Sequence, residues 1–246
     1  MYYTRHRTAS VALALGLGGL CAWLRLWLYN NAMEPENLLG KPWLQYLLAG
    51  ITVLSLIVYL CLARLSPLPQ QRPKYPRASD GAFVCLLLAS PLLMIGSAIN
   101  FLTYRDIPAA LCAALGIAAG VCLIPVALCR RSGHWPNELF HGVLTTFCLT
   151  FALCYFRRVG HDPQLLDYVF QLLAWISLML CAYHRCLYDC DRGGRWRLEF
   201  FALCGQFFCL VSLTAGEDTL LFLGGFLWAV TALPSPRAHV FAHHQQ

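Results

Sequence analysis

The chain has 246 residues, a formal net charge of +6 and a mean hydropathy of +0.57; 59% of its residues are hydrophobic and 12% are charged. Soluble globular domains carry about 25% charged residues, so this composition excludes a water-soluble protein and indicates a membrane protein. The basic residues lie at the ends of apolar blocks, so their expected partner is the lipid bilayer and not nucleic acid.

Eight apolar blocks follow one another along the sequence and predict an all-α, polytopic transmembrane bundle of about eight membrane segments. Their lengths suit a hydrocarbon core of roughly 30 Å, and a lipid-exposed chain satisfies its own backbone there as a helix. The blocks cover residues 8–29, 43–64, 82–104, 107–129, 138–156, 165–187, 197–214 and 218–233. We interpret the first block as a retained signal anchor.

The last two blocks are the shortest, because 18 and 16 residues of helix reach only roughly 24 to 27 Å. They predict either two thin spans or a re-entrant hairpin that turns at residues 215–219. Both alternatives leave the C-terminus on the same side.

The distribution of basic residues predicts that both termini lie inside, in the cell membrane. Thirteen of the 18 basic residues then fall in inner segments, as the positive-inside rule requires. These are Arg5, Arg7, Arg64, Arg72, Lys74, Arg77, Arg130, Arg131, Arg185, Arg192, Arg195, Arg197 and Arg237, and the outer segments hold Arg25, Lys41, Arg105, Arg157 and Arg158.

The domain organisation is predicted to be a single integral membrane domain over residues 1–246. Residues 65–81 form a proline-rich, basic cytoplasmic connector, residues 188–196 a cytoplasmic turn, and residues 234–246 a cytoplasmic tail. No soluble module is expected.

A stripe of small residues on the fourth block is predicted to pack against another helix. Small side chains at helical spacing let two backbones approach closely where lipid removes the hydrophobic drive. The stripe consists of Ala109, Ala113, Gly116 and Gly120. We expect an intramolecular seam, with a homo-oligomer contact as the alternative.

Four uncharged polar residues inside apolar blocks are the candidates for a polar cavity. They are Ser97, Asn100, Gln171 and Gln206. Their alternative role is to form hydrogen bonds between helices, which is common for such residues in membranes.

Glu138 and His141 are the candidates for catalysis, because they are three residues apart and can share a helix face. Cys181, His184, Cys186 and Cys190 are the candidates for a metal site, although four ligands at this spacing do not converge from one straight helix. No cofactor is predicted.

These features favour a non-catalytic multi-pass membrane protein. It would bind or transport a small solute, or act as a membrane subunit or sensor for a membrane or cytoplasmic protein partner. The alternative is an intramembrane enzyme that acts on a lipid or lipid-linked substrate and holds its phosphate with inner arginines.

Overall fold

The computed structural model describes residues 2–31, 42–66, 78–160, 165–216 and 218–233. Every regular element in these ranges is helical, which confirms the predicted all-α bundle. The helices are α1 (Tyr2–Asn31), α2 (Pro42–Arg64), α3 (Asp80–Tyr104), α4 (Ile107–Ser132), α5 (Glu138–Val159), α6 (Leu165–Asp189), α7 (Arg195–Ser212) and α8 (Thr219–Ala232), with a short 3₁₀ turn, η1 (Leu213–Ala215), before α8. The predicted connector and tail lie largely outside the described residues.

Side-chain caps define where several of these helices begin. The Ser79 hydroxyl accepts a hydrogen bond from the Ala82 N–H at the start of α3. Asp106 does the same for the Ala109 N–H at the start of α4, at 2.7 Å. Such caps satisfy N–H groups that have no partner inside the helix. Gly133 ends α4 with a φ of 81°, a backbone conformation that glycine adopts without steric cost.

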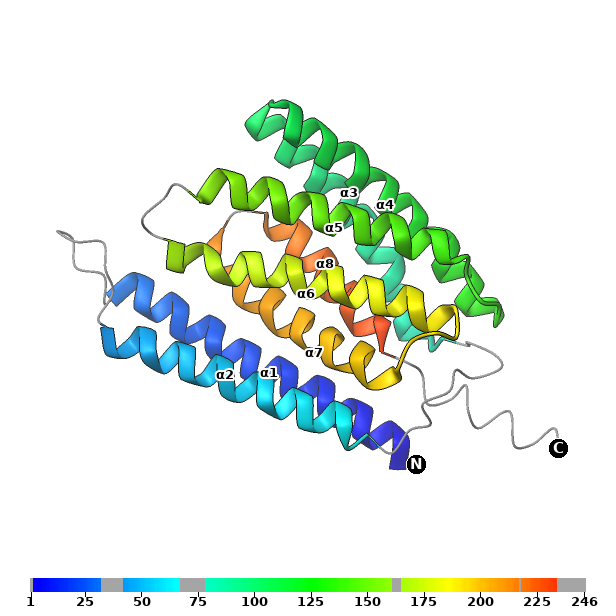
Figure 1. Ribbon diagram of the computed structural model, residues 1–246, viewed down its shortest axis with the longest axis horizontal. Helices are drawn as coiled ribbons and strands as arrows, with labels where there is room; N and C mark the ends of the chain where they lie inside the picture. Colours follow the sequence, from blue (N-terminus) through cyan, green and yellow to red (C-terminus); the bar gives the residue numbers. More distant parts are fainter. Residues whose placement is uncertain (1, 32–41, 67–77, 161–164, 217, 234–246) are drawn as a thin grey trace.

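Six helices, α3 to α8, form a ring in which each packs against its neighbours in the chain and α8 closes back on α3. The α1–α2 pair lies outside this ring and packs against α7. Figure 1 shows α1 and α2 along one side of the molecule, α3 and α4 along the other, and α6, α7 and α8 between them.

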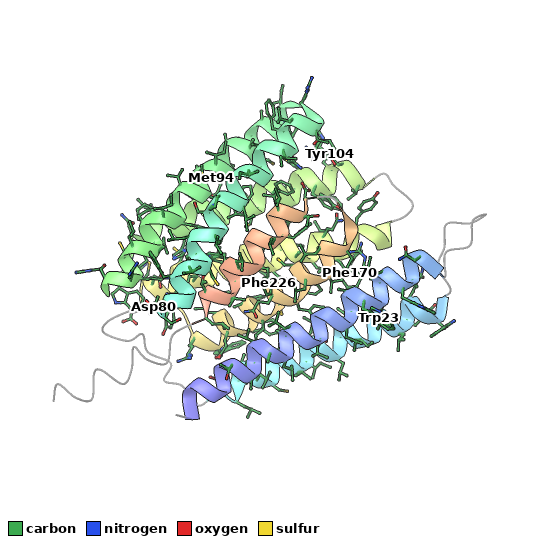
Figure 2. The ribbon with its side chains drawn as sticks, turned by 180° about the vertical axis from the view of Figure 1, so that it is seen from behind. Trp23, Asp80, Met94, Tyr104, Phe170 and Phe226 are labelled. Atoms are coloured by element: carbon green, nitrogen blue, oxygen red, sulfur yellow. The ribbon has the colours of Figure 1, made fainter. Side chains whose placement is uncertain are left out.

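The helices α1 to α6 each contain a stretch long and apolar enough to cross a membrane. Large apolar side chains such as Val53, Leu54 and Leu153 are more than half exposed, as expected for a lipid-facing surface. We refer to the end that holds the starts of α1, α3, α5 and α7 as the predicted inner end, and to the opposite end as the predicted outer end. Figure 2 shows Asp80 and Tyr104 at the two ends of α3.

The last two helices are short and yet lie in the middle of the bundle. Helix α8 begins beside Asn100 near the outer end of α3 and finishes beside Arg130 near the inner end of α4. The α7–α8 pair therefore extends between the two ends of the ring.

The small-residue stripe of α4 faces α3 across the closest seam of the ring. A Cβ atom on Gly116 would overlap the Ser97 side chain, and one on Gly120 would lie 2.8 Å from the Ser90 carbonyl oxygen. The Ser90 hydroxyl donates a 2.7 Å hydrogen bond to the Gly120 carbonyl. Ala109 and Ala113 are buried on the same helix.

An aromatic core fills the middle of the bundle. The Trp175 ring of α6 stacks on Phe151 at 4.2 Å between centroids, meets Phe147 edge-on at 5.6 Å and packs against Phe222 of α8 at 5.5 Å. All four rings are almost fully buried.

Candidate functional site

A pocket with polar and apolar lining lies at the predicted outer end, between the last turns of α3 and the start of α8. Its volume is about 340 Å³, which suits a small-molecule ligand. We call it the outer pocket; it is lined by Gly96, Ile99, Asn100, Thr103, Tyr104, Gly216, Asp218, Thr219 and Leu220.

Asn100 and Asp218 provide the central polar contact of this pocket. The Asn100 amide nitrogen Nδ2 donates a 2.9 Å hydrogen bond to Asp218 Oδ1. Asn100 is only 3% exposed, and its amide oxygen Oδ1 is buried with no hydrogen-bond partner among the described residues. A buried amide oxygen costs free energy unless a partner satisfies it. The pocket therefore contains an acceptor that a bound solute can satisfy.

The backbone holds Asp218 in the position that this contact requires. Asp218 precedes α8 with a φ of 52°, in the left-handed region that costs a non-glycine residue about 1 kcal/mol or more. Its side chain does not cap α8 and instead bonds to Asn100. Gly96 lies one turn before Asn100 on α3, and a Cβ atom there would come within 2.8 Å of the Leu221 side chain. Helices α3 and α8 therefore approach each other closely beside the pocket.

A second polar site lies at the predicted inner end and is buried. We call it the ion cluster; it comprises Arg130 of α4, His141 of α5, and Arg185 and Asp189 of α6. Each of these residues is at most 5% exposed. Buried charges persist in proteins only when they are paired and hydrogen-bonded.

The Asp189 carboxylate is the centre of the ion cluster. Its Oδ1 lies 3.0 Å from Arg185 Nη2, and its Oδ2 lies 3.1 Å from His141 Nε2 and 4.0 Å from Arg130 Nη2. If His141 is neutral, the four residues of the ion cluster carry two positive charges, on Arg130 and Arg185, and one negative charge, on Asp189. The cluster then has a net charge of +1.

The same nitrogen of His141 faces two partners. Its Nε2 lies 3.1 Å from Asp189 Oδ2 and 3.2 Å from Arg130 Nη2. Protonated Nε2 donates to Asp189, whereas unprotonated Nε2 accepts from Arg130, so the tautomer decides which bond forms.

The end of α8 is held by side chains from three other helices. Arg130 Nη1 donates to the Thr231 carbonyl at 3.3 Å, and Arg185 Nη1 donates to the Ala232 carbonyl at 2.9 Å. Gln206 of α7 donates through Nε2 to the Ala229 carbonyl at 3.4 Å. These carbonyls belong to the last turn of α8, where the helix itself supplies no donors and where cations are favourable. Helix α8 therefore connects the outer pocket to the ion cluster.

The structure distributes the four predicted cavity residues over different sites. Asn100 lines the outer pocket. Ser97 packs over Gly116 in the α3–α4 seam, and Gln206 bonds to α8 near the inner end. Gln171 is buried on α6 and is not among the residues that line the pocket. The four residues thus do not surround one cavity.

The two predicted catalytic residues, Glu138 and His141, lie in different environments. Glu138 is exposed at the start of α5, whereas His141 is completely buried one turn later. The carboxylate beside His141 belongs to Asp189, which is on another helix. Of the predicted pair, His141 alone enters the ion cluster.

The four predicted metal ligands lie in different surroundings. Cys181 is buried in the core, and the His184 ring stacks on Phe201 at 5.1 Å. The Cys186 thiol donates to the Glu138 carbonyl at 3.6 Å, one turn before Cys190. The described residues contain no group of three or more metal-ligating side chains, and all thirteen cysteines are free thiols.

Sequence reasoning did not identify Asp218 or Asp189 as site residues. Asp189 falls in the predicted turn at residues 188–196, but it is the last residue of α6, and its carboxylate is buried beside Arg185 and His141. The spacing of Arg185 and Asp189, four residues apart, was the available signal for a helical ion pair. Asp218 is one of two adjacent carboxylates in a short turn, a pattern that could attract cations but is typical of solvated charges, and its partner Asn100 is 118 residues away.

The fold and its two polar sites define a helical membrane protein with a pocket at one end and a buried charge network at the other. The chain matches no protein-family model, no curated protein and no solved structure. Its function must therefore be inferred from these sites.

Proposed function

We propose that this protein is a non-catalytic, multi-pass protein of the cell membrane that binds a small polar solute in the outer pocket. The observation that carries this proposal is the buried Asn100 amide oxygen, which has no hydrogen-bond partner among the described residues and lies at a cavity of about 340 Å³. A solute that donates to this oxygen removes the cost of leaving it unsatisfied. The exposed rim residues Thr103 and Thr219 supply further polar groups.

The position of α8 supports a sensing role for this binding. Its first residues line the pocket, and its last carbonyls accept hydrogen bonds from Arg130 and Arg185 of the ion cluster. A solute that moves the start of α8 therefore acts on the inner end, where a cytoplasmic partner would meet the protein. The aromatic core around Trp175 favours binding over passage of the solute through the bundle.

The test is a melting experiment on the purified protein in lipid nanodiscs with a panel of small polar solutes. A solute that binds the folded state raises the melting temperature as its concentration increases. Thr103→Trp fills the pocket from its rim and should abolish the increase.

Leu102→Trp is the matched control, because Leu102 is 61% exposed on the same turn of α3 but does not line the pocket. It should leave the increase unchanged. A solute effect that survives Thr103→Trp would contradict the proposed site.

A catalytic alternative rests on the pairing of His141 with Asp189 beside Arg130. A histidine and carboxylate pair can act as a general base, and guanidinium groups can hold a phosphate. This alternative requires that lipid-phosphate turnover by the purified protein disappears in His141→Gln while the folded yield is retained. Turnover that is absent from the wild-type protein, or that persists in the variant, excludes it.

A further inference from the structure

We infer that the solute of the outer pocket is a small organic ammonium ion with N–H donors. This inference rests on the proposed binding function and names the class of solute. It follows from the hydrogen bonds that the polar side chains of the pocket already make.

Three of the four side chains with donors that line the pocket donate to acceptors in the protein. The Thr103 hydroxyl donates to the Ile99 carbonyl at 3.0 Å, and the Thr219 hydroxyl donates to the Gly216 carbonyl at 3.2 Å. The Asn100 amide nitrogen donates to Asp218. The oxygen atoms of these groups therefore remain available as hydrogen-bond acceptors, and a complementary solute carries hydrogen-bond donors.

The Asn100 oxygen is the acceptor that most needs a donor. It is buried, and no hydrogen-bond partner for it exists among the described residues. The Asp218 carboxylate, bonded to the same amide, places a negative charge beside it. Hydrogen bonds to charged groups are stronger than neutral ones, so a cationic donor gains more here than a neutral donor does.

The Arg158 guanidinium, which lies against a residue that lines the pocket, is held by other groups. It stacks on the Tyr104 ring at 3.8 Å and lies 3.5 Å from the Asp106 carboxylate. Asp218 also stands at the start of α8, where a carboxylate complements the positive end of the helix dipole.

The size of the pocket indicates an organic cation and not a bare metal ion. A cavity of about 340 Å³ holds several non-hydrogen atoms, whereas a metal ion needs a compact shell of oxygen ligands at 2.0 to 2.6 Å. Apolar lining from Ile99 and Leu220 would contact the carbon atoms of such a cation.

The experiment measures binding of three probes to the protein in nanodiscs, from the concentration dependence of the melting temperature. The probes are n-butylammonium chloride, tetramethylammonium chloride and sodium butyrate. Butylammonium should bind, tetramethylammonium should bind at least about ten-fold more weakly because it has no N–H donor, and butyrate should not bind.

Asp218→Asn and Asn100→Leu should each weaken butylammonium binding by about ten-fold or more. Asp80→Asn is the control, because Asp80 is an exposed carboxylate at the end of α3 opposite to Asn100. This substitution should leave butylammonium binding unchanged. The melting temperature of each variant without probe reports whether it folds. Asp218→Asn keeps the shape of the side chain, so the test does not depend on the leucine variant.

Other outcomes overturn the inference. Equal binding of butylammonium and tetramethylammonium, binding of butyrate, or an equal effect of sodium or potassium chloride would each contradict an ammonium site. If butyrate or a neutral solute binds and Thr103→Trp abolishes that binding, the proposed function stands and this inference fails. If Thr103→Trp affects no solute, both fail.

Discussion

Arg185 and Asp189 lie one turn apart on α6, and their charged groups meet at 3.0 Å in the interior of a membrane protein. The two residues are 4% and 5% exposed. Arg185 also donates to the last carbonyl of α8, so this ion pair joins the end of one helix to the end of another.

Asp189→Asn should strongly destabilise the protein. The substitution removes the buried carboxylate that pairs with Arg185 and faces Arg130, and breaking a buried pair in this way costs about 3 to 5 kcal/mol. The measurement is the free energy of unfolding in mixed micelles. Asp191→Asn is the control, because Asp191 is exposed two residues further along and asparagine tolerates its φ of 60°; its effect should stay within about 0.5 kcal/mol. Equal effects of the two substitutions would show that Asp189 does not balance the cluster.

Arg185→Gln should cost less than Asp189→Asn, although both remove one side of the same ion pair. The arginine substitution leaves Arg130 opposite Asp189 and removes the excess positive charge, whereas the aspartate substitution raises that excess. In a double-mutant cycle, the double variant should be more stable than the sum of the single effects predicts, by about 1 kcal/mol or more. Additive effects would mean that the two charges do not interact energetically.

Gly120→Ala should destabilise the α3–α4 seam by about 1 to 3 kcal/mol, because the added methyl group meets the Ser90 backbone and Met94. Gly16→Ala on α1 is the matched control, since no atom lies within 4 Å of its Cβ position. Alanine there should be neutral or slightly stabilising, because it is the better helix former. Thermal melting of the two variants side by side makes the comparison. Equal melting temperatures of the two variants would contradict a close backbone contact at Gly120.

Asp218→Gly should leave the free energy of unfolding nearly unchanged but weaken the binding of n-butylammonium. Glycine relieves the left-handed backbone at this position but loses the hydrogen bond from Asn100, so the two contributions of about 1 to 2 kcal/mol nearly cancel. Binding of n-butylammonium should nevertheless fall by about ten-fold or more.

Arg105→Gly is the control for the backbone contribution, since Arg105 has the same φ of 52° at the exposed end of α3. It should stabilise the protein by up to about 1 kcal/mol and leave binding intact. Loss of binding in Arg105→Gly, or retention in Asp218→Gly, would argue against a specific role for the Asp218 carboxylate.

Much of the fold could be predicted from the sequence, because apolar length and helix caps are local properties. The block predicted at 107–129 corresponds to α4 at Ile107–Ser132, and the block at 82–104 to α3 at Asp80–Tyr104. The ends of these helices are marked by residues such as Asp106 and Gly133, whose effects act within one turn.

The sites were harder to predict, because they depend on how distant helices face one another. Asn100 was identified as a polar residue at membrane depth, but its partner Asp218 comes from a turn 118 residues later. Arg185 was assigned to the inner surface on the basis of its charge, whereas the structure buries it against α8. The direction in which the last turn of α6 faces is set by its packing on α5 and α7, which a single sequence does not contain.

Calorimetry in nanodiscs, with a solute that raises the melting temperature, measures the stoichiometry of solute binding and so tests the outer pocket directly. We expect one binding site per chain in the wild-type protein and in Leu102→Trp, and none in Thr103→Trp. Unchanged stoichiometry in Thr103→Trp would place the binding site elsewhere and contradict the assignment of the outer pocket.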